Sequence, residues 1–290
     1  ILFERFAIDV LRATQTVKNA MAILRLKWDA TWHIIERAVE RGKARKEPSI
    51  LPRIGIDEKA FAKGHSFVSM IYDLDNSTVE AISDGHDTEA AIACFSQLSE
   101  TQLQSVEAIA MDMSPAYVKA AKQVIPLAET KIVHDIFHVM QLANKAVDKV
   151  RKSEHRHLLE EGDDQLKGSK YLWLTSYENL TEAQAKRFES LCSLKLETGR
   201  AWSYKELLRD LWAHDSENQA KAFFNNWYQR VIHTKLGPMK KLARTLKERI
   251  NNIVTYCTHG ITNSVAEGIN SKIMSIKRRV GGFRNRENFK

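Results

Sequence analysis

The sequence predicts an α/β protein in which a mixed sheet is preceded by a small helical segment and interrupted by an all-helical insertion. Three observations lead to this prediction. Apolar residues recur at helical spacing over residues 1–46, strand-like segments fill much of 50–140, and no strand signal occurs between 141 and 255. The length of 290 residues suits one large or two medium domains.

The first 46 residues have the pattern of three short helices. The third carries an apolar stripe and the basic residues Arg37, Arg41 and Lys43. We therefore interpret 1–46 as a helix-turn-helix DNA-binding segment. A plain three-helix packing unit is the alternative, because the turn at 26–28 has no glycine.

A linker with two prolines leads into residues 50–140, the first part of the predicted sheet domain. Ser114 is a good N-cap and Pro115 suits a first helical position, so a helix is expected up to about residue 125. The expected element order is β-β-β-α-β-α-β-α, with antiparallel hairpins first and crossover units after. The expected strands are 54–57, 66–74, 78–82, 106–112 and 131–134.

Residues 141–255 show only helical patterns and are interpreted as an insertion. We assign its four tryptophans mainly to the hydrophobic core: Trp173, Trp202, Trp212 and Trp227. Residues 256–290 then form the last part of the sheet domain, with a final helix that starts near Thr262 and ends at Gly281-Gly282.

The net charge of +8 is unevenly distributed. Residues 235–290 carry a net +10 and residues 1–50 a net +4, so the middle is acidic. Basic ends around an acidic middle favour a polyanionic partner such as nucleic acid. Solvated helix faces are the alternative.

Several classes of protein are disfavoured. The three cysteines form no CxxC pair, which argues against a disulfide framework or a cysteine zinc site and fits a reducing cytosol. No apolar run approaches the roughly 18–20 residues of a membrane span. No GxSxG, Walker or Rossmann glycine pattern occurs.

Three carboxylates stand where they can converge. Asp57 and Asp112 are expected to end strands, and Glu267 shares a polar helix stripe with Asn263 and Asn270. Such a set of oxygen ligands suits a hard divalent cation. Each acid also has a structural explanation: Asp112 as a turn residue, Asp57 as a solvated strand end, and Glu267 at capping-box spacing from Ser264.

Four segments together resemble the DDE transposases of the ISL3 insertion-sequence family: "GIDEKAFAKGHSFVSMIYDLD", "AMDMSPAYVKAAKQVIP", "KIVHDIFHVMQLANKAVDKVR" and "TNSVAEGINSKIMSIKRRVGGFRNRENF". The resemblance implies an RNase H-like catalytic core, split by the helical insertion, that cuts and joins DNA with two Mg²⁺ ions, or Mn²⁺ as a substitute. It places the metal-binding catalytic acids on Asp57, Asp112 and Glu267. It also implies assembly of a homo-oligomer on DNA in the bacterial cytoplasm, at the nucleoid.

Family members usually have a cysteine-rich, zinc-binding segment ahead of the helix-turn-helix, and this sequence has none. We therefore expect a fragment of a longer protein.

The resemblance also marks accessory residues. Asp135 and His138 match a D-x-x-H motif seen at this place in related transposases, where they would line the site. A helix N-terminus with a favoured acid explains them equally well. The basic residues after Glu267 would hold DNA backbone, with a solvated cationic face as the alternative; they are Lys272, Lys277, Arg278, Arg279, Arg284 and Arg286.

The leading expectation is thus a DDE transposase that cleaves DNA and transfers strands. Two alternatives stand beside it: a DNA-binding regulator with an inactive core, and a metal-dependent nuclease that never joins strands.

Overall fold

The computed structural model describes residues 2–14, 16–46, 49–62 and 66–279. Two compact units are present. One comprises the described residues up to 50 together with 271–279, and the other comprises 51–270. No helix among the described residues is long and apolar enough to cross a membrane.

The N-terminal unit contains the three expected helices, α1 (Leu2–Ala13), α2 (Val17–Leu24) and α3 (Trp28–Arg45). Thr16 caps α2 by accepting the N–H of Asn19, and Arg25 ends it in the left-handed conformation at φ 55°. A residue other than glycine thus makes the turn. The helix-turn-helix assignment stays a prediction.

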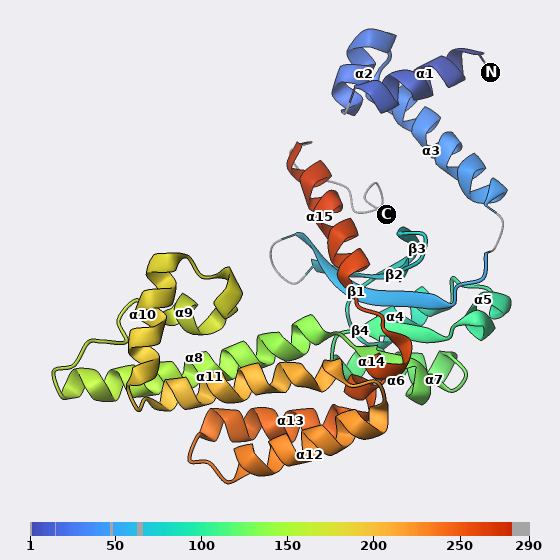
Figure 1. The fold of residues 1–290 in the computed structure, drawn as a ribbon. Helices are drawn as coiled ribbons and strands as arrows, with labels where there is room; N and C mark the ends of the chain where they lie inside the picture. Colours follow the sequence, from blue (N-terminus) through green and yellow to red (C-terminus); the bar gives the residue numbers. More distant parts are fainter. Residues whose placement is uncertain (1, 15, 47–48, 63–65, 280–290) are drawn as a thin grey trace. The chain divides into compact units, whose positions relative to one another are not determined.

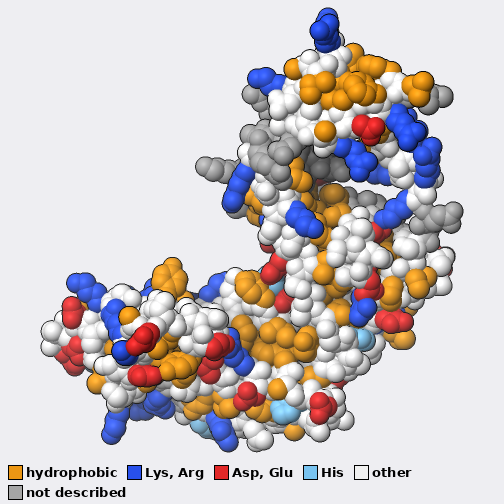
Figure 2. Space-filling model, turned by 45° about the horizontal axis from the view of Figure 1, so that its top comes forward, with side chains coloured by type: hydrophobic (Ala, Val, Ile, Leu, Met, Phe, Trp, Pro, Cys, Tyr) orange, Lys and Arg blue, Asp and Glu red, His pale blue; other side chains and the backbone are white. Residues whose placement is uncertain are grey.

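The core of this small unit consists of four buried residues, Ala7, Ala20, Leu24 and Ile34. Large apolar side chains of this unit are exposed, among them Phe3, Phe6 and Ile23. Figure 2 shows hydrophobic side chains gathered on the surface of the N-terminal unit. Glu4 contacts Arg37 at 3.2 Å and Arg41 at 3.0 Å. Arg37 and Arg41, two of the basic residues of the third helix, are therefore paired within the unit.

The larger unit contains a five-stranded sheet in the order β3-β2-β1-β4-β5. β1 pairs with β2, and β2 with β3, in antiparallel fashion, whereas β4 and β5 run parallel to β1. This mixed α/β architecture is compatible with the expected RNase H-like core (Figure 1). The strands are β1 (Arg53–Ala62), β2 (Ser66–Asp73), β3 (Thr78–Asp84), β4 (Ala108–Met111) and β5 (Ile132–His134).

One strand, β1, differs from its predicted bounds by more than two residues at one end. β1 does not end at Asp57 but continues to Ala62, because its second half pairs with β2, with Glu58 opposite Ser69. The pairing of β1 with the shorter β4 ends at Ile56, and Asp57 is the next residue of β1. A polar second half is tolerated because the side chains of residues 57–60 are exposed or half-buried.

Helices α4 (Thr88–Phe95), α5 (Glu100–Ser105), α6 (Pro115–Val124) and α7 (Ala128–Lys131) connect the strands. α5 is an addition to the predicted elements, and its Ser99–Gln102 capping box is complete. Pro115 takes the first position of α6 as expected, but the Ser114 side chain makes no capping bond. The core beneath α4 and α6 contains Ile56, Phe95, Ile109 and Met111.

After β5 the described chain is helical. The long helices α8, α11, α12 and α13 pack side by side (Figure 1). Their bounds, with those of the shorter helices, are α8 (Ile136–Glu160), α9 (Lys170–Leu174), α10 (Glu182–Ser193), α11 (Glu197–Leu208), α12 (Glu217–Ile232), α13 (Gly237–Val254), α14 (Tyr256–His259) and α15 (Ser264–Arg279), with 3₁₀ turns at Tyr177–Asn179 and Arg209–Ala213.

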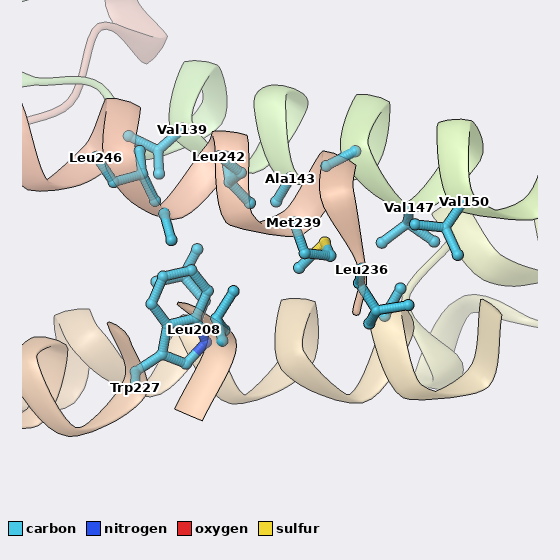
Figure 3. Close-up of a cluster of buried hydrophobic side chains, with 14 of the residues drawn as sticks. Val139, Ala143, Val147, Val150, Leu208, Trp227, Leu236, Met239, Leu242 and Leu246 are labelled. Carbon is cyan, nitrogen blue, oxygen red and sulfur yellow. The ribbon is translucent and has the colours of Figure 1, made fainter. Parts of the chain in front are cut away.

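The helical part has its own apolar core (Figure 3). Trp173 and Trp227 are fully buried, and their indole N–H groups donate to Ser169 Oγ and the Tyr204 carbonyl. Buried indoles with satisfied N–H groups are structural. The core assignment is therefore confirmed for these two tryptophans.

Candidate active site at the carboxyl end of the parallel strands

Three aspartates stand in register at one edge of the sheet. Ile56 on β1 is aligned with Met111 on β4, and Met111 with His134 on β5. In each strand the next residue is an aspartate: Asp57, Asp112 and Asp135.

The register also fixes the face on which these aspartates lie. Ile56 and Met111 belong to the core under α4 and α6. Because successive side chains in a strand point to opposite faces, the aspartates that follow them belong to the other face. On that face Ala110 and Val133 pack against Ile261, just before α15. The aspartates and α15 therefore share one side of the sheet.

Asp57 is held by two hydrogen bonds. Its Oδ1 accepts the N–H of Glu58 at 2.9 Å, and its Oδ2 accepts Nδ2 of Asn270 at 2.9 Å. The hydroxyl of Tyr72 donates to Oδ1 of Asn270 at 3.1 Å, which fixes the orientation of the amide. Asn270 is only 6% exposed. This Tyr72–Asn270–Asp57 chain sets the direction of the first carboxylate.

The pKa of Asp57 is raised to about 6, chiefly by burial, with smaller contributions in the same direction from the negative charges of Glu58 and Asp112. A positive charge on His138 would act in the opposite direction. Burial and Asp112 also raise the pKa of Glu58. Asp57 and Asp112 thus lie close enough for their charges to interact, in a partly desolvated place where a bound cation would offset that repulsion.

Asp112 lies on the loop between β4 and α6. Its Oδ1 accepts the N–H of Ser114 at 2.8 Å, and its carbonyl accepts Nδ1–H of His134 at 3.0 Å. Burial lowers the pKa of His134 to about 4, so the ring is neutral at pH 7. Asp112 is thus a turn residue through Oδ1, while its Oδ2 has no hydrogen bond within the described chain. Its catalytic role stays a prediction.

Asp135 has a different role from the other two aspartates. Its Oδ1 accepts the N–H of Phe137 and caps α8, while its Oδ2 accepts the N–H of Asn263 at 2.7 Å. It is 3% exposed. Both oxygens are committed to backbone N–H groups, so Asp135 ties β5 to the start of α15.

Asn263 brings α15 against β1. Its Nδ2 donates to the Ile56 carbonyl at 3.4 Å, and it is 1% exposed. A Cβ at Gly55 would clash with Oδ1 of Asn263. Glycine at position 55 is thus what allows this close approach.

Glu267 lies between these two contacts on the same helix. Asn263 and Asn270, four residues before it and three after it, both touch the end of the parallel part of β1. Residues at this spacing share one face of a helix. The Glu267 side chain is exposed and, within the described chain, forms no hydrogen bond or ion pair with its carboxylate. The structure therefore brings Asp57 and Asp112 together and places Glu267 on the adjoining helix stripe, outside the cluster.

The oxygen donors present fit a divalent cation in part. Asp57 and Asp112 offer hard ligands in a place where like charges repel. However, no three His, Cys, Asp or Glu side chains in the described part of the chain are close enough to hold a metal ion. A complete site needs the Glu267 side chain to turn toward the two aspartates.

The remaining predicted residues have varied positions. His138 lies one turn into α8, with its ring 5.5 Å from that of Phe137, and its charge influences Asp57. Lys272, Lys277 and Arg278 lie on α15. Arg279 ends that helix, and Arg284 and Arg286 lie outside the described residues.

Two further residues at this site, Tyr72 and Glu58, were not predicted from the sequence, and Asn270 was predicted only as part of a polar stripe. A tyrosine in a strand is usually predicted to be a core residue. Nothing in the sequence around Glu58, apart from its neighbour Asp57, predicts a functional role.

Comparison with known proteins gives a separate line of evidence. Residues 54–290 match the model of a family described as a transposase, the ISL3 group of DDE transposases. The transposase of insertion sequence element IS1001 from Bordetella parapertussis is 29% identical over 279 residues, which cover 93% of this chain and 68% of the relative. The transposase of IS1557 from Mycobacterium tuberculosis is 23% identical over 287 residues, 91% of this chain and 64% of the relative.

The chain thus spans about two thirds of the length of these relatives. The family match covers the sheet, the helical part and α15, and includes all three carboxylates. The chain belongs to the ISL3 family of transposases.

Proposed function

We propose that this chain catalyses metal-dependent cleavage and strand transfer of insertion-sequence DNA, with Asp57, Asp112 and Glu267 as its acidic triad. The observation that carries the proposal is the register of β1 and β4, which sets Asp57 beside Asp112 on the face shared with α15. Family membership supports the same chemistry.

The protein groups have distinct roles in this proposal. Asp57 and Asp112 hold the cation with carboxylate oxygens, and Asn270 keeps Oδ2 of Asp57 in place. Glu267 completes the ligand set from α15. A divalent cation, Mg²⁺ or Mn²⁺, supplies the activation of a water or 3′-hydroxyl and the stabilisation of the leaving oxygen.

The rest of the chain serves DNA binding in the same proposal. Residues 1–46 act as a helix-turn-helix, and 141–255 form an insertion within an RNase H-like core that comprises 50–140 and 256–290. The cations that follow Glu267 contact DNA backbone, and two copies assemble on paired ends.

The test is a cleavage assay on duplex DNA that carries the ends of the encoding element, with and without Mg²⁺. We expect metal-dependent nicking, and joining of pre-cleaved 3′ ends to a second duplex. Asp112→Asn is expected to lower the rate at least about 100-fold, since even outer-shell partners of metal ligands contribute about 10- to 100-fold. Asp87→Asn, at the exposed cap of α4, is the control.

The outcomes separate the alternatives. If Asp112→Asn cleaved DNA at the wild-type rate, the assignment of the acidic triad would be wrong. Nicking without joining would identify a nuclease. DNA binding without nicking at any divalent ion would identify a regulator.

A second prediction concerns the metal-free protein. Because the pKa of Asp57 in the folded protein is about 6 and its ordinary value is 3.8, folding is favoured when the group is protonated, and this contribution is lost as pH rises from about 4 to above 6. At pH 7.5 the ionised Asp57 therefore lowers the free energy of unfolding by at most about 3 kcal/mol. Asp57→Asn removes this destabilisation but alters a hydrogen bond, at a cost of about 1 kcal/mol. The variant should therefore have a free energy of unfolding about 1–2 kcal/mol higher than the wild type at pH 7.5 in EDTA.

Urea unfolding at pH 4 and pH 7.5 checks this prediction. At pH 4 the variant should gain nothing. Added Mg²⁺ should stabilise the wild type and leave Asp57→Asn unchanged. If the substitution changed the free energy of unfolding equally at both pH values, ionised Asp57 would not destabilise the folded protein and the prediction would be wrong.

A further inference from the structure

A hollow of about 530 Å³ lies between α6 and α13, on the opposite side of the sheet edge from the aspartates. We call it the α6–α13 pocket. Met113 and Pro115, from the loop that carries Asp112, form one wall, and His134 lines it from the end of β5. The volume is in the range of small-ligand sites.

The charges around the pocket are mainly positive. Lys119 and Lys122 are exposed, three residues apart on α6, and Arg249 reaches the pocket from α13. Glu248 is the one carboxylate on the lining. Like charges at this spacing on a helix do not stabilise it, so the fold itself gains little from the pair of lysines.

Existing ion pairs leave these cations available to a ligand. Lys122 is 3.6 Å from Glu129, and Arg249 is 3.4 Å from Glu248, a carboxylate that is itself 72% exposed. Exposed pairs of this kind contribute little free energy. Lys119 has no ion pair within the described part of the chain.

The far wall of the pocket is fixed in place. Asn252 donates to the Glu129 carbonyl at 3.1 Å, and Thr255 Oγ1 donates to the Ile132 carbonyl at 2.7 Å. These bonds tether the end of α13 beside β5. The two cationic walls therefore keep their spacing, as a preorganised anion site requires.

The pocket is also joined to the candidate active site. His134 lines the pocket, and its Nδ1–H donates to the carbonyl of Asp112. The residues directly after Asp112 form the wall. The pocket therefore shares the loop between β4 and α6 with Asp112.

We propose that the α6–α13 pocket binds a backbone phosphate of the DNA substrate through Lys119, Lys122 and Arg249. The inference rests on the proposed function, since it concerns how that function's substrate is held. Lysine and arginine are suited to phosphate oxygens, and arginine can bind them in a bidentate manner. The pocket positions the strand and reads no sequence.

The test is the salt dependence of DNA binding. Fluorescence anisotropy with a random-sequence 30-base-pair duplex in EDTA, over a series of NaCl concentrations, gives the slope of log K against log salt. Each lost phosphate contact reduces this slope by about 1. Lys119→Ala/Lys122→Ala should therefore reduce it by about 1–2, and Arg249→Ala by about 1.

The matched control is Lys149→Ala/Lys152→Ala. These lysines are exposed, have the same three-residue spacing on α8, and remove the same charge. The control should keep the wild-type slope. Equal slopes for both double variants, whether reduced or unchanged, would overturn the proposal.

Two further arms make the result specific. Sodium phosphate should displace the duplex no better than NaCl of equal ionic strength; stronger displacement would indicate a site for free phosphate and overturn the assignment to DNA. If the slope falls as expected while the wild type never nicks DNA with Mg²⁺, the pocket stands and the proposed catalysis fails. If nicking occurs and the slope does not change, the pocket proposal alone fails.

Discussion

Gly55→Ala should abolish most DNA cleavage and lower the free energy of unfolding by about 1–3 kcal/mol, the usual cost of overpacking a filled site. The added Cβ would clash with Oδ1 of Asn263 and would approach Leu74 Cδ2 to 3.0 Å. Asn263 cannot simply turn aside, because it is buried and its backbone N–H is bonded to Asp135. The start of α15 must therefore move away from β1.

The loss of cleavage should exceed what the loss of stability explains. Asn270 and Glu267 lie on α15, which begins directly after Asn263, so Asp57 loses its orienting amide and Glu267 moves. Thermal unfolding and the nicking assay, both at a temperature where the variant is fully folded, separate the two effects.

Gly268→Ala is the control for Gly55→Ala. Gly268 lies in α15 beside Glu267, and a Cβ there meets nothing within 4 Å. Alanine in a helix interior should stabilise it by up to about 1 kcal/mol and leave cleavage intact. Full activity of Gly55→Ala would show that α15 does not need its close contact with β1.

The order of elements could be predicted from the sequence because it depends on local signals. The alternating strands, the Ser114-Pro115 helix start and the helical stripes each lie within about ten residues. The observed order β1 to β5 with α4, α6 and α8 follows that prediction. The length of β1 could not be read in this way, because its second half is a strand only through pairing with β2.

Of the residues at the candidate site, only the carboxylates could be predicted from the sequence. Asp57 and Asp112 follow apolar runs, which is a local signal. The contacts that arrange them join distant segments: Asn270 to Asp57, Asn263 to Asp135, and Tyr72 to Asn270. Glycine at 55 and tyrosine at 72 look ordinary until α15 is placed on the sheet. The strand-end positions and the family resemblance therefore predicted the acids but not the residues that hold them.

Asp135 provides the second test of how α15 is held. Asp135→Ala removes both oxygens and leaves the N–H of Asn263 buried without an acceptor, at a cost of about 1–3 kcal/mol. Loss of the α8 cap at Phe137 adds about 1 kcal/mol. The free energy of unfolding should therefore fall by about 2–4 kcal/mol. Asp87→Ala, which removes the exposed cap of α4, should cost only about 1 kcal/mol.

Asp135→Asn tests whether Asp135 holds the start of α15 through the N–H of Asn263 or binds a metal ion. The amide can still cap α8 with its oxygen, but its NH₂ group then faces the N–H of Asn263, so only the bond to α15 is lost. Hydrogen exchange should accelerate at the first turns of α15 and stay unchanged in α8, while the increase in Tm on adding Mg²⁺, which depends on Asp57 and Asp112, is retained. Loss of the Mg²⁺ effect with unchanged exchange in α15 would make Asp135 a ligand. Its two backbone partners argue against that outcome, because an oxygen that already accepts a short N–H bond has less lone-pair density to offer a cation.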